Sequence, residues 1–282
     1  KLAAYNKFAD GDTVDVGLIM AADGDATHID NLITIAENRM DAVVFASPER
    51  SDVVNITDAN TQKDNIIGFF NGIRSSSYVV FDSGYKYMYD RYNDVYRHVP
   101  LNGDIAGLGA RTDLIADSWF SPAGFNRGVV RGAVKLAYNP TQTQRDDLYR
   151  ARVNPVATFP GQGTVLFGDK TGLASPSAFD RINVRRLLLQ ARKLISAVAV
   201  RLLFEQNDEQ VRQEFLDSVN PILDSIRRDR GLIDFRVTVS NTPEDLDSNT
   251  LTGKIYLKPT RALEFIDIEF LITPTGASFE DI

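Results

Sequence analysis

The first half of the chain alternates between short apolar runs and longer stretches in which apolar residues recur every three or four positions. The short runs predict buried strands, and the longer stretches predict amphipathic helices. In chain order we expect strand, helix, strand, helix and strand at Val14–Met20, Ile29–Asn38, Ala42–Phe45, Asp58–Arg74 and Val79–Phe81. Strands that alternate with helices favour a mostly parallel α/β sheet.

Helical spacing returns at 101–118 and 142–151, and a stretch rich in Gly and Pro follows at 159–178. Such a stretch is typical of loops. A chain of this length has room for about two domains. We therefore expect an α/β domain over residues 1–175 and a second domain over residues 176–282.

The second domain has a different pattern. We expect a long helix at Phe179–Phe204 and another that begins at Asp208 and ends before Pro221, because proline interrupts helices. Three strands are expected after them, at Ile233–Val239, Leu251–Leu257 and Ala262–Ile272. This order favours an α+β domain in which helices pack on a small antiparallel or mixed sheet.

The long helix of the second domain is basic. At about 100° per residue, one apolar stripe is expected to be buried: Val184, Leu187, Leu188, Ala191, Leu194, Ile195, Val198 and Leu202. A neighbouring arc mixes cations with aliphatic side chains: Arg181, Ile182, Arg185, Arg186, Leu189, Arg192, Lys193 and Val200. No acid lies between residues 181 and 204, although the chain has a net charge of -7. Two interpretations stay open: the arc contacts another protein, or it pairs with acids of its own fold.

Composition narrows the classes of function. The acidic balance argues against general affinity for nucleic acid, which goes with a basic face. The absence of Cys excludes disulfides and thiolate chemistry. No apolar run approaches the roughly 20 residues that span a bilayer, so we expect no membrane anchor. Because the sequence begins at Lys1 and not at Met, we expect it to be part of a longer protein.

A near match to a phosphate-binding loop lies at residues 163–171. Gly163 and Gly168 have the right spacing, but Asp169 stands before Lys170 and Thr171. A P-loop needs its Lys directly after the Gly, so that the ammonium and backbone N–H groups converge on the phosphates. Asp169 would place a carboxylate among those anions. We therefore expect no nucleotide and no other cofactor.

A hydrolytic site and a metal site are equally poorly supported. A catalytic triad needs a nucleophile, an imidazole base and a carboxylate. The chain has only His28 and His98, and Ser121 lacks the G-x-S-x-G context. The acidic turns at 10–12 and 23–25 do not continue into a calcium loop. We expect no enzyme activity and no bound metal.

Seven motifs follow one another in the second and third quarters and at the end of the chain. Two are the most informative, FPGQGTVLFGDKT at 159–171 and FDRINVRRLLL at 179–189. The others are DSGYKY at 82–87, GDIAG at 103–107, WFSPAGFNRG at 119–128, LTGKIYLKPTR at 251–261 and FLITPTGASF at 270–279. Together they resemble the contractile tail sheath proteins of T4-like phages.

The resemblance implies a fold and a function. It implies a subtilisin-like α/β middle domain, followed by a C-terminal α+β sheath domain that contains the long basic helix. It implies a structural subunit that polymerises around the tail tube and contracts to drive the tube through the host envelope. The implied partners are other copies in stacked hexameric rings, the tail tube protein, and the baseplate and tail terminator proteins. The implied place is the virion tail, after assembly in the host cytoplasm, with no direct contact to nucleic acid.

The resemblance also implies two interaction surfaces. Residues expected to face the tube are Arg181, Ile182, Arg185, Arg186, Leu189, Arg192 and Lys193. Residues expected to form an arm between subunits are Thr273, Pro274, Gly276, Phe279 and Ile282. Two alternatives stay open: a hydrolase or nucleotide-binding enzyme on a subtilisin-like core, and the sheath of a related contractile injection system.

Overall fold

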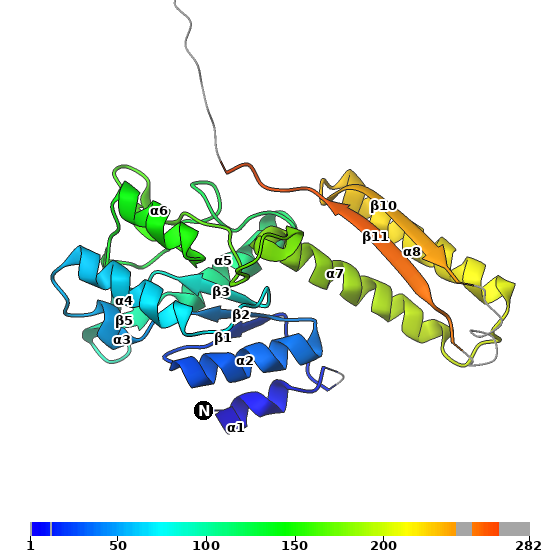
Figure 1. The fold of residues 1–282 in the computed structure, drawn as a ribbon, viewed down its shortest axis with the longest axis horizontal. Helices are drawn as coiled ribbons and strands as arrows, with labels where there is room; N and C mark the ends of the chain where they lie inside the picture. Colours follow the sequence, from blue (N-terminus) through cyan, green and yellow to red (C-terminus); the bar gives the residue numbers. More distant parts are fainter. Residues whose placement is uncertain (1, 12, 241–249, 265–282) are drawn as a thin grey trace, which may run out of the picture.

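The structure is a computed structural model that describes residues 2–11, 13–240 and 250–264. It has an α/β body and a narrower lobe that is joined to the body by one long helix (Figure 1). The helices of the body are α1 (Leu2–Tyr5), α2 (Ala26–Arg39), α3 (Arg50–Val53), α4 (Ala59–Asn71), α5 (Asn102–Ile115) and α6 (Gln142–Arg150). Short 3-10 turns are η1 (Asn6–Phe8), η2 (Ala178–Asp180) and η3 (Val200–Leu202).

Nine strands form three sheets in the body. They are β1 (Leu18–Met20), β2 (Val43–Ala46), β3 (Val79–Asp82), β4 (Tyr85–Asp90), β5 (Val95–Pro100), β6 (Lys135–Leu136), β7 (Val153–Asn154), β8 (Val156–Phe159) and β9 (Gly163–Leu166). The central sheet is parallel, in the order β1-β2-β3-β7. The sequence predicted its first three strands and the helices between them.

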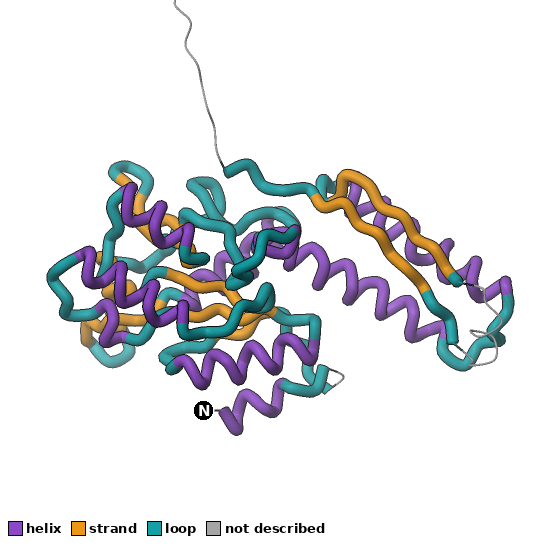
Figure 2. Tube along the Cα trace, in the orientation of Figure 1, coloured by secondary structure: helices purple, strands orange, loops and turns teal. Residues whose placement is uncertain are grey.

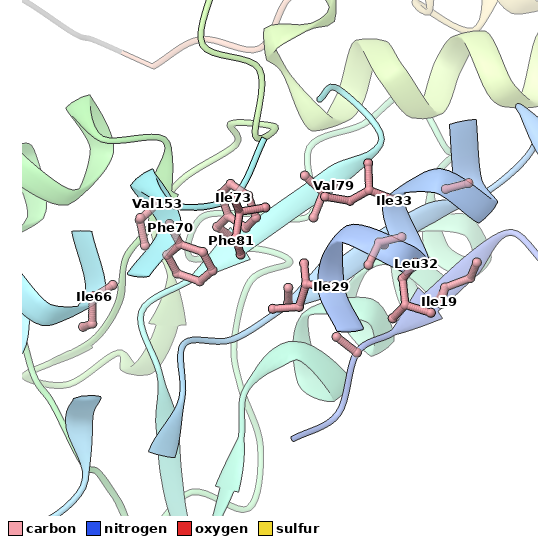
Figure 3. Close-up of a cluster of buried hydrophobic side chains, with 14 of the residues drawn as sticks. Ile19, Ile29, Leu32, Ile33, Ile66, Phe70, Ile73, Val79, Phe81 and Val153 are labelled. Atoms are coloured by element: carbon pink, nitrogen blue, oxygen red, sulfur yellow. The ribbon is translucent and has the colours of Figure 1, made fainter. Parts of the chain in front are cut away.

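Both faces of this sheet are covered. Every residue of β2 and β3 is buried, as expected for parallel strands with helices on both sides. On one face, α2 and α4 contribute Ile29, Leu32, Ile33, Ile66 and Phe70 to the first core (Figure 3). On the other face, a second core contains α5 residues and the start of the long basic helix, including Ile105, Leu108 and Ile182.

The helices and strands of the lobe in the described ranges are α7 (Ile182–Ala199), α8 (Glu209–Arg228), β10 (Leu232–Val239) and β11 (Gly253–Pro259). Its core contains Leu187, Ala191, Phe215, Val219 and Leu223. The strands pair antiparallel, with Phe235 opposite Leu257. Helices packed on a small antiparallel sheet agree with the α+β prediction for this part of the chain.

The structure corrects two details of the prediction, and a third lies mostly outside the described residues. Helix α8 continues through Pro221, because that residue is exposed while Phe215, Val219 and Leu223 bury the opposite face. The segment 159–178, expected to be a loop, contains strand β9, which pairs with β8. Of the strand expected at 262–272, only residues 262–264 are described, and they are not in a strand.

Candidate functional site: the long basic helix

Helix α7 passes from the second core of the body into the core of the lobe. Ile182 and Leu189 pack in the body, whereas Leu187 and Ala191 pack against α8 and the β10–β11 hairpin. Figure 2 shows the helix running from the central sheet to the far end of the lobe. The first half of α7 is therefore enclosed by neighbours, and only its second half offers an open face.

The Arg185 guanidinium lies inside the molecule, and only 5% of the residue is exposed. It is 4.3 Å from the ring centroids of both Tyr78 and Phe179, and it donates a hydrogen bond to the Ser77 hydroxyl. Burial lowers the pKa of Arg185. A cation between two aromatic faces is stabilised by the ring quadrupoles, so Arg185 has its partners within its own chain.

Arg186 and Arg181 are also paired within the chain. Arg186, 5% exposed, forms a salt bridge with Asp113 and donates to the Gly109 carbonyl at 3.2 Å. Arg181 forms salt bridges with Asp180 and Glu264. Asp180 directly precedes α7, whereas Asp113 of α5 and Glu264 lie far from α7 in sequence.

Four residues expected to face the tube are therefore buried, and the prediction that they form an outer arc is corrected. They are Ile182, Arg185, Arg186 and Leu189, at 0%, 5%, 5% and 8% exposure. The physical reason is that the first half of α7 is covered both by the second core of the body and by the core of the lobe. Sequence spacing predicts which side chains share a face but not how many neighbours that face has.

Arg192 and Lys193 lie on the exposed side of α7. The Lys193 ammonium contacts both carboxylate oxygens of Asp15, at 2.6 and 2.7 Å, and about half of its side chain remains exposed. Arg192 lies against the Met40 sulfur. An exposed ion pair such as Lys193–Asp15 contributes about 0–1 kcal/mol, and Arg192 is exposed without a salt bridge among the described residues.

The second half of α7 and the turn after it expose apolar side chains, of which the sequence analysis had placed only Val200 in the candidate arc. Leu194, Val200, Leu203 and Phe204 are 38%, 63%, 61% and 102% exposed. Phe204 also has a positive φ of 71°, which bulky residues rarely adopt. We define the distal surface as Arg192, Lys193, Leu194, Val200, Arg201, Leu203 and Phe204. In the sequence, the adjacent apolar residues Leu203 and Phe204 before a polar turn could have indicated this exposed apolar surface.

The expected burial of Leu194 is wrong. The buried or half-buried stripe instead follows Leu187, Ala191, Ile195, Ala199 and Leu202. This stripe is narrower than predicted because α7 contacts its lobe on one side only.

The β10–β11 hairpin is a second candidate surface. Within the described residues each strand pairs only with the other, and Ile233 and Tyr256 are exposed. A two-stranded sheet has two edges that another chain can extend through backbone hydrogen bonds. The predicted arm residues Thr273, Pro274, Gly276, Phe279 and Ile282 lie outside the described residues.

The residues considered for catalysis lie in separate elements of the body. Lys170 donates to the Tyr149 carbonyl, and its ammonium is 4.2 Å from the Tyr149 ring centroid. No helix begins at Thr171, so a P-loop is not formed. Ser121 lies in the loop between α5 and β6, whereas His28 is in α2 and His98 is in β5.

Two searches of the described part of the chain were negative. No group of three or more His, Asp or Glu side chains is placed to hold a metal ion there. No helix in that part is long and apolar enough to cross a bilayer.

Comparison with known families covers nearly the whole chain. The phage tail sheath protein central domain matches residues 5–172, and the phage tail sheath C-terminal domain matches residues 174–273. This chain belongs to the phage tail sheath family. The recognition made from the seven motifs is confirmed, and the family is one of structural proteins and not of enzymes.

Individual phage proteins are similar over most of the chain. The tail sheath protein of Vibrio phage KVP40 is 44% identical over 265 residues, which are 88% of this chain and 39% of that protein. The tail sheath protein of Enterobacteria phage T4 is 37% identical, over 100% of this chain and 45% of that protein. The chain thus spans less than half the length of these relatives.

Solved structures share the fold at lower identity. A chain of the anti-feeding prophage baseplate has a TM-score of 0.77 and 18% identity, with 97% of this chain and 73% of that chain covered. The sheath complex of an extracellular contractile injection system, PVC, in its contracted state, has a TM-score of 0.76 and 20% identity, with 95% and 72% covered. At this identity the likeness shows the fold alone.

Proposed function

We propose that this chain is the polymerising part of a contractile tail sheath subunit of a T4-like phage. The observation that carries the proposal is the family membership: two sheath domains match in order across almost the whole chain. The relatives above 30% identity are phage proteins, which favours a phage tail over another contractile injection system. In this role the subunits encircle the tail tube and contract to drive it through the host envelope.

The proposed partners are other copies in stacked hexameric rings, the tail tube protein, and the baseplate and terminator proteins. Assembly would take place in the host cytoplasm, and the finished sheath is part of the virion. The energy for contraction would be stored in the lattice during assembly, with no cofactor. The continuous helix α7, packed in two cores, supports subunits that move largely as rigid bodies between two packings.

We propose that the distal surface faces the tube. Arg192, Lys193 and Arg201 supply positive charge, and Leu203 and Phe204 supply apolar contact. Arginine and aromatic side chains are enriched at protein interfaces. Each exposed ion pair is weak, but a sheath would repeat the contact in every subunit. Numerous weak contacts suit a surface that must be released during contraction.

We propose that residues 273–282 form an arm that adds to the β10–β11 hairpin of a neighbouring subunit. The two open strand edges support this proposal, since a further strand would satisfy their backbone groups. The description of the middle domain as subtilisin-like also remains a proposal. Superposition of its parallel sheet on subtilisin-like enzymes, strand by strand, would test that description.

Charge reversal tests the tube-facing surface. We would change Arg192, Lys193 and Arg201 to Glu in the full-length protein and measure its co-sedimentation with tail tubes. The expected result is lost binding with an unchanged unfolding midpoint. Wild-type binding should also weaken as salt rises, because screening shortens to about 3 Å at 1 M.

The matched control reverses three exposed cations away from the distal surface, Arg91, Arg131 and Arg150. It changes the net charge equally and should bind tubes like the wild type. If the distal triple variant binds tubes as well as the wild type, the distal surface does not face the tube.

A further inference from the structure

The β4–β5 hairpin turns an aromatic face toward solvent. Residues directly opposite each other in an antiparallel pair share a face, and here Tyr87 is opposite His98 and Tyr89 is opposite Tyr96. The ring centroids are 4.8 Å apart for Tyr87 and His98, 5.5 Å for Tyr87 and Tyr96, and 5.1 Å for Tyr89 and Tyr96. Tyr89 and Tyr96 are 43% and 55% exposed. We define the tyrosine face as Tyr87, Tyr89, Tyr96 and His98.

The opposite face of the hairpin is covered by its own chain. Lys86 is 6% exposed, and its ammonium lies 2.7 Å from the Asp104 carboxylate of α5. Leu136 of β6, opposite Lys86, is buried as well. In contrast, no residue of the tyrosine face belongs to a hydrophobic core formed by the described residues. Exposed apolar patches of this kind mark interaction sites.

The surroundings of the tyrosine face indicate the chemistry of a partner. The Lys135 ammonium lies 5.4 Å from the Tyr87 ring centroid. Partial burial, Arg50 and Lys135 together lower the pKa of His98, which keeps its ring neutral near pH 7. Neither Arg50 nor Lys135 forms a salt bridge within residues 2–11, 13–240 and 250–264. Because tyrosine is enriched at protein interfaces, the face fits a protein surface that is apolar and carries hydrogen-bond acceptors or carboxylates.

The tyrosine face lies on the side where the chain enters the body. Side chains alternate along a strand, so Tyr85, the first residue of β4, is on the same side as Tyr87. The Tyr85 hydroxyl donates a hydrogen bond to the Asp23 carboxylate at 3.1 Å. Asp23 and Leu2 line the same hollow at the start of α2. A segment that precedes Leu2 therefore approaches the body beside the root of the hairpin.

The phage relatives have a large additional part that could reach this place. This chain spans 39% and 45% of the tail sheath proteins of phages KVP40 and T4. The alignment with the T4 protein covers 300 residues for the whole of this chain, so the additional length is not inserted within the matched part. The C-terminal sheath domain matches residues 174–273. We therefore place the additional length upstream of residue 1.

We propose that the tyrosine face binds the part of its own subunit that precedes residue 1. In this contact the tyrosine rings would be buried against apolar side chains, and Arg50 and Lys135 would face acceptors. A segment tethered beside the face has a high effective concentration there. Figure 1 places β5 at the end of the body away from the lobe. The inference rests on the family membership, and it depends neither on the tube-facing role of the distal surface nor on the arm.

Nitration of tyrosine by tetranitromethane tests the contact directly. We would treat the 282-residue chain and the protein at its natural full length, both at concentrations at which sedimentation shows single subunits. Trypsin then releases residues 87–91 and 92–97 as separate peptides, and mass spectrometry assigns the nitro groups. Tyr89 and Tyr96 should be nitrated in the 282-residue chain and should lose most of this reactivity in the full-length protein. Tyr256, which is 57% exposed in the lobe, is the internal control and should react equally in both.

A pair of substitutions tests the same contact by stability. Tyr89→Ser with Tyr96→Ser should lower the unfolding midpoint more in the full-length protein than in the 282-residue chain, where these rings already face water. Tyr256→Ser is the matched control and should have the same effect in both proteins, and circular dichroism would check that each variant is folded.

Three results would overturn the proposal. The first is equal nitration of Tyr89 and Tyr96 in the two proteins. The second is an equal loss of midpoint in the two proteins for the double variant. The third is protection that appears only when the full-length protein polymerises, because a neighbouring subunit would then cover the tyrosine face.

Discussion

At the scale of single residues, the ends of the central strands are tied together by one buried carboxyl. Asp82, at the end of β3, accepts hydrogen bonds from the Gly84 N–H at 2.8 Å and from the Ser47 hydroxyl at 2.7 Å. The Ser47 oxygen in turn accepts from the Asn102 N–H at 3.0 Å. This network joins β2, β3 and the start of α5. Burial raises the pKa of Asp82 to about 8.

The raised pKa of Asp82 predicts a pH dependence of stability. In the unfolded chain an Asp has a pKa near 3.9, so between about pH 4 and pH 8 the folded protein keeps a proton that the unfolded chain has lost. The unfolding free energy should therefore fall as pH rises through this window. Asp82→Asn keeps a neutral acceptor for Gly84 and should reduce that slope. Urea unfolding at several pH values measures it.

The control for this experiment is Asp146→Asn, an exposed carboxyl on α6, which should keep the wild-type slope. Asp169, whose pKa is also raised, contributes a slope of the same sign that both variants retain. Equal slopes in the wild type and in Asp82→Asn would contradict the assignment of the pH dependence to Asp82.

At the scale of elements, the phase of α7 decides which of its leucines stabilise the lobe. Leu187 is 2% exposed in the lobe core, whereas Leu194 is 38% exposed. Leu187→Ala should reduce the unfolding free energy by about 2–5 kcal/mol, as large-to-small changes in a core do. Leu194→Ala should cost about 0.5 kcal/mol, as surface changes do. Urea denaturation of both variants compares them; a larger loss for Leu194→Ala would reject the observed phase.

The sequence predicted most elements because local patterns specify them. The apolar runs gave β2 and β3, and the periodic stretches gave α2 and α4 within a few residues. The tyrosine-rich β4–β5 hairpin was not predicted, since Tyr87, Tyr89 and Tyr96 stack on each other across the strands and not on a core. The helix from Asp208 was wrongly expected to end before Pro221. A proline costs about 3 kcal/mol in a helix interior, but packing of the opposite face of α8 offsets this cost.

The candidate site was only partly predictable, for a related reason. The sequence showed that α7 carries cations without acids, but it could not show that Asp113 and Glu264 approach Arg186 and Arg181. For Arg181, Arg186 and Lys193, pairing with acids of the same fold, one of the two interpretations left open, is what the structure shows.

At the scale of the whole molecule, α7 links two cores. Two features have no partner among residues 2–11, 13–240 and 250–264, namely the apolar side chains of the distal surface and the β10–β11 edges. In the proposed sheath role, these two surfaces would contact neighbouring subunits and the tube. A pocket between body and lobe, lined by residues as far apart in sequence as Trp119 and Glu264, could not be predicted because local patterns do not show which distant segments meet.

Deletion of residues 274–282 tests the proposed arm. The variant should be soluble, with the wild-type circular dichroism and unfolding midpoint, but it should fail to polymerise, because the hairpin edges would lack their added strand. Ser278→Ala is the control within the arm and should polymerise normally. Normal polymerisation by the deletion variant would rule out an essential arm.

The most direct test of the sheath assignment is negative-stain electron microscopy of this protein at its natural full length, alone and with tail tubes of its phage. We predict hollow tubes or stacked rings, and decorated tubes when the tail tubes are present. Particles that stay single and globular in both samples, while circular dichroism shows them folded, would contradict the conclusion that this chain polymerises as a contractile tail sheath.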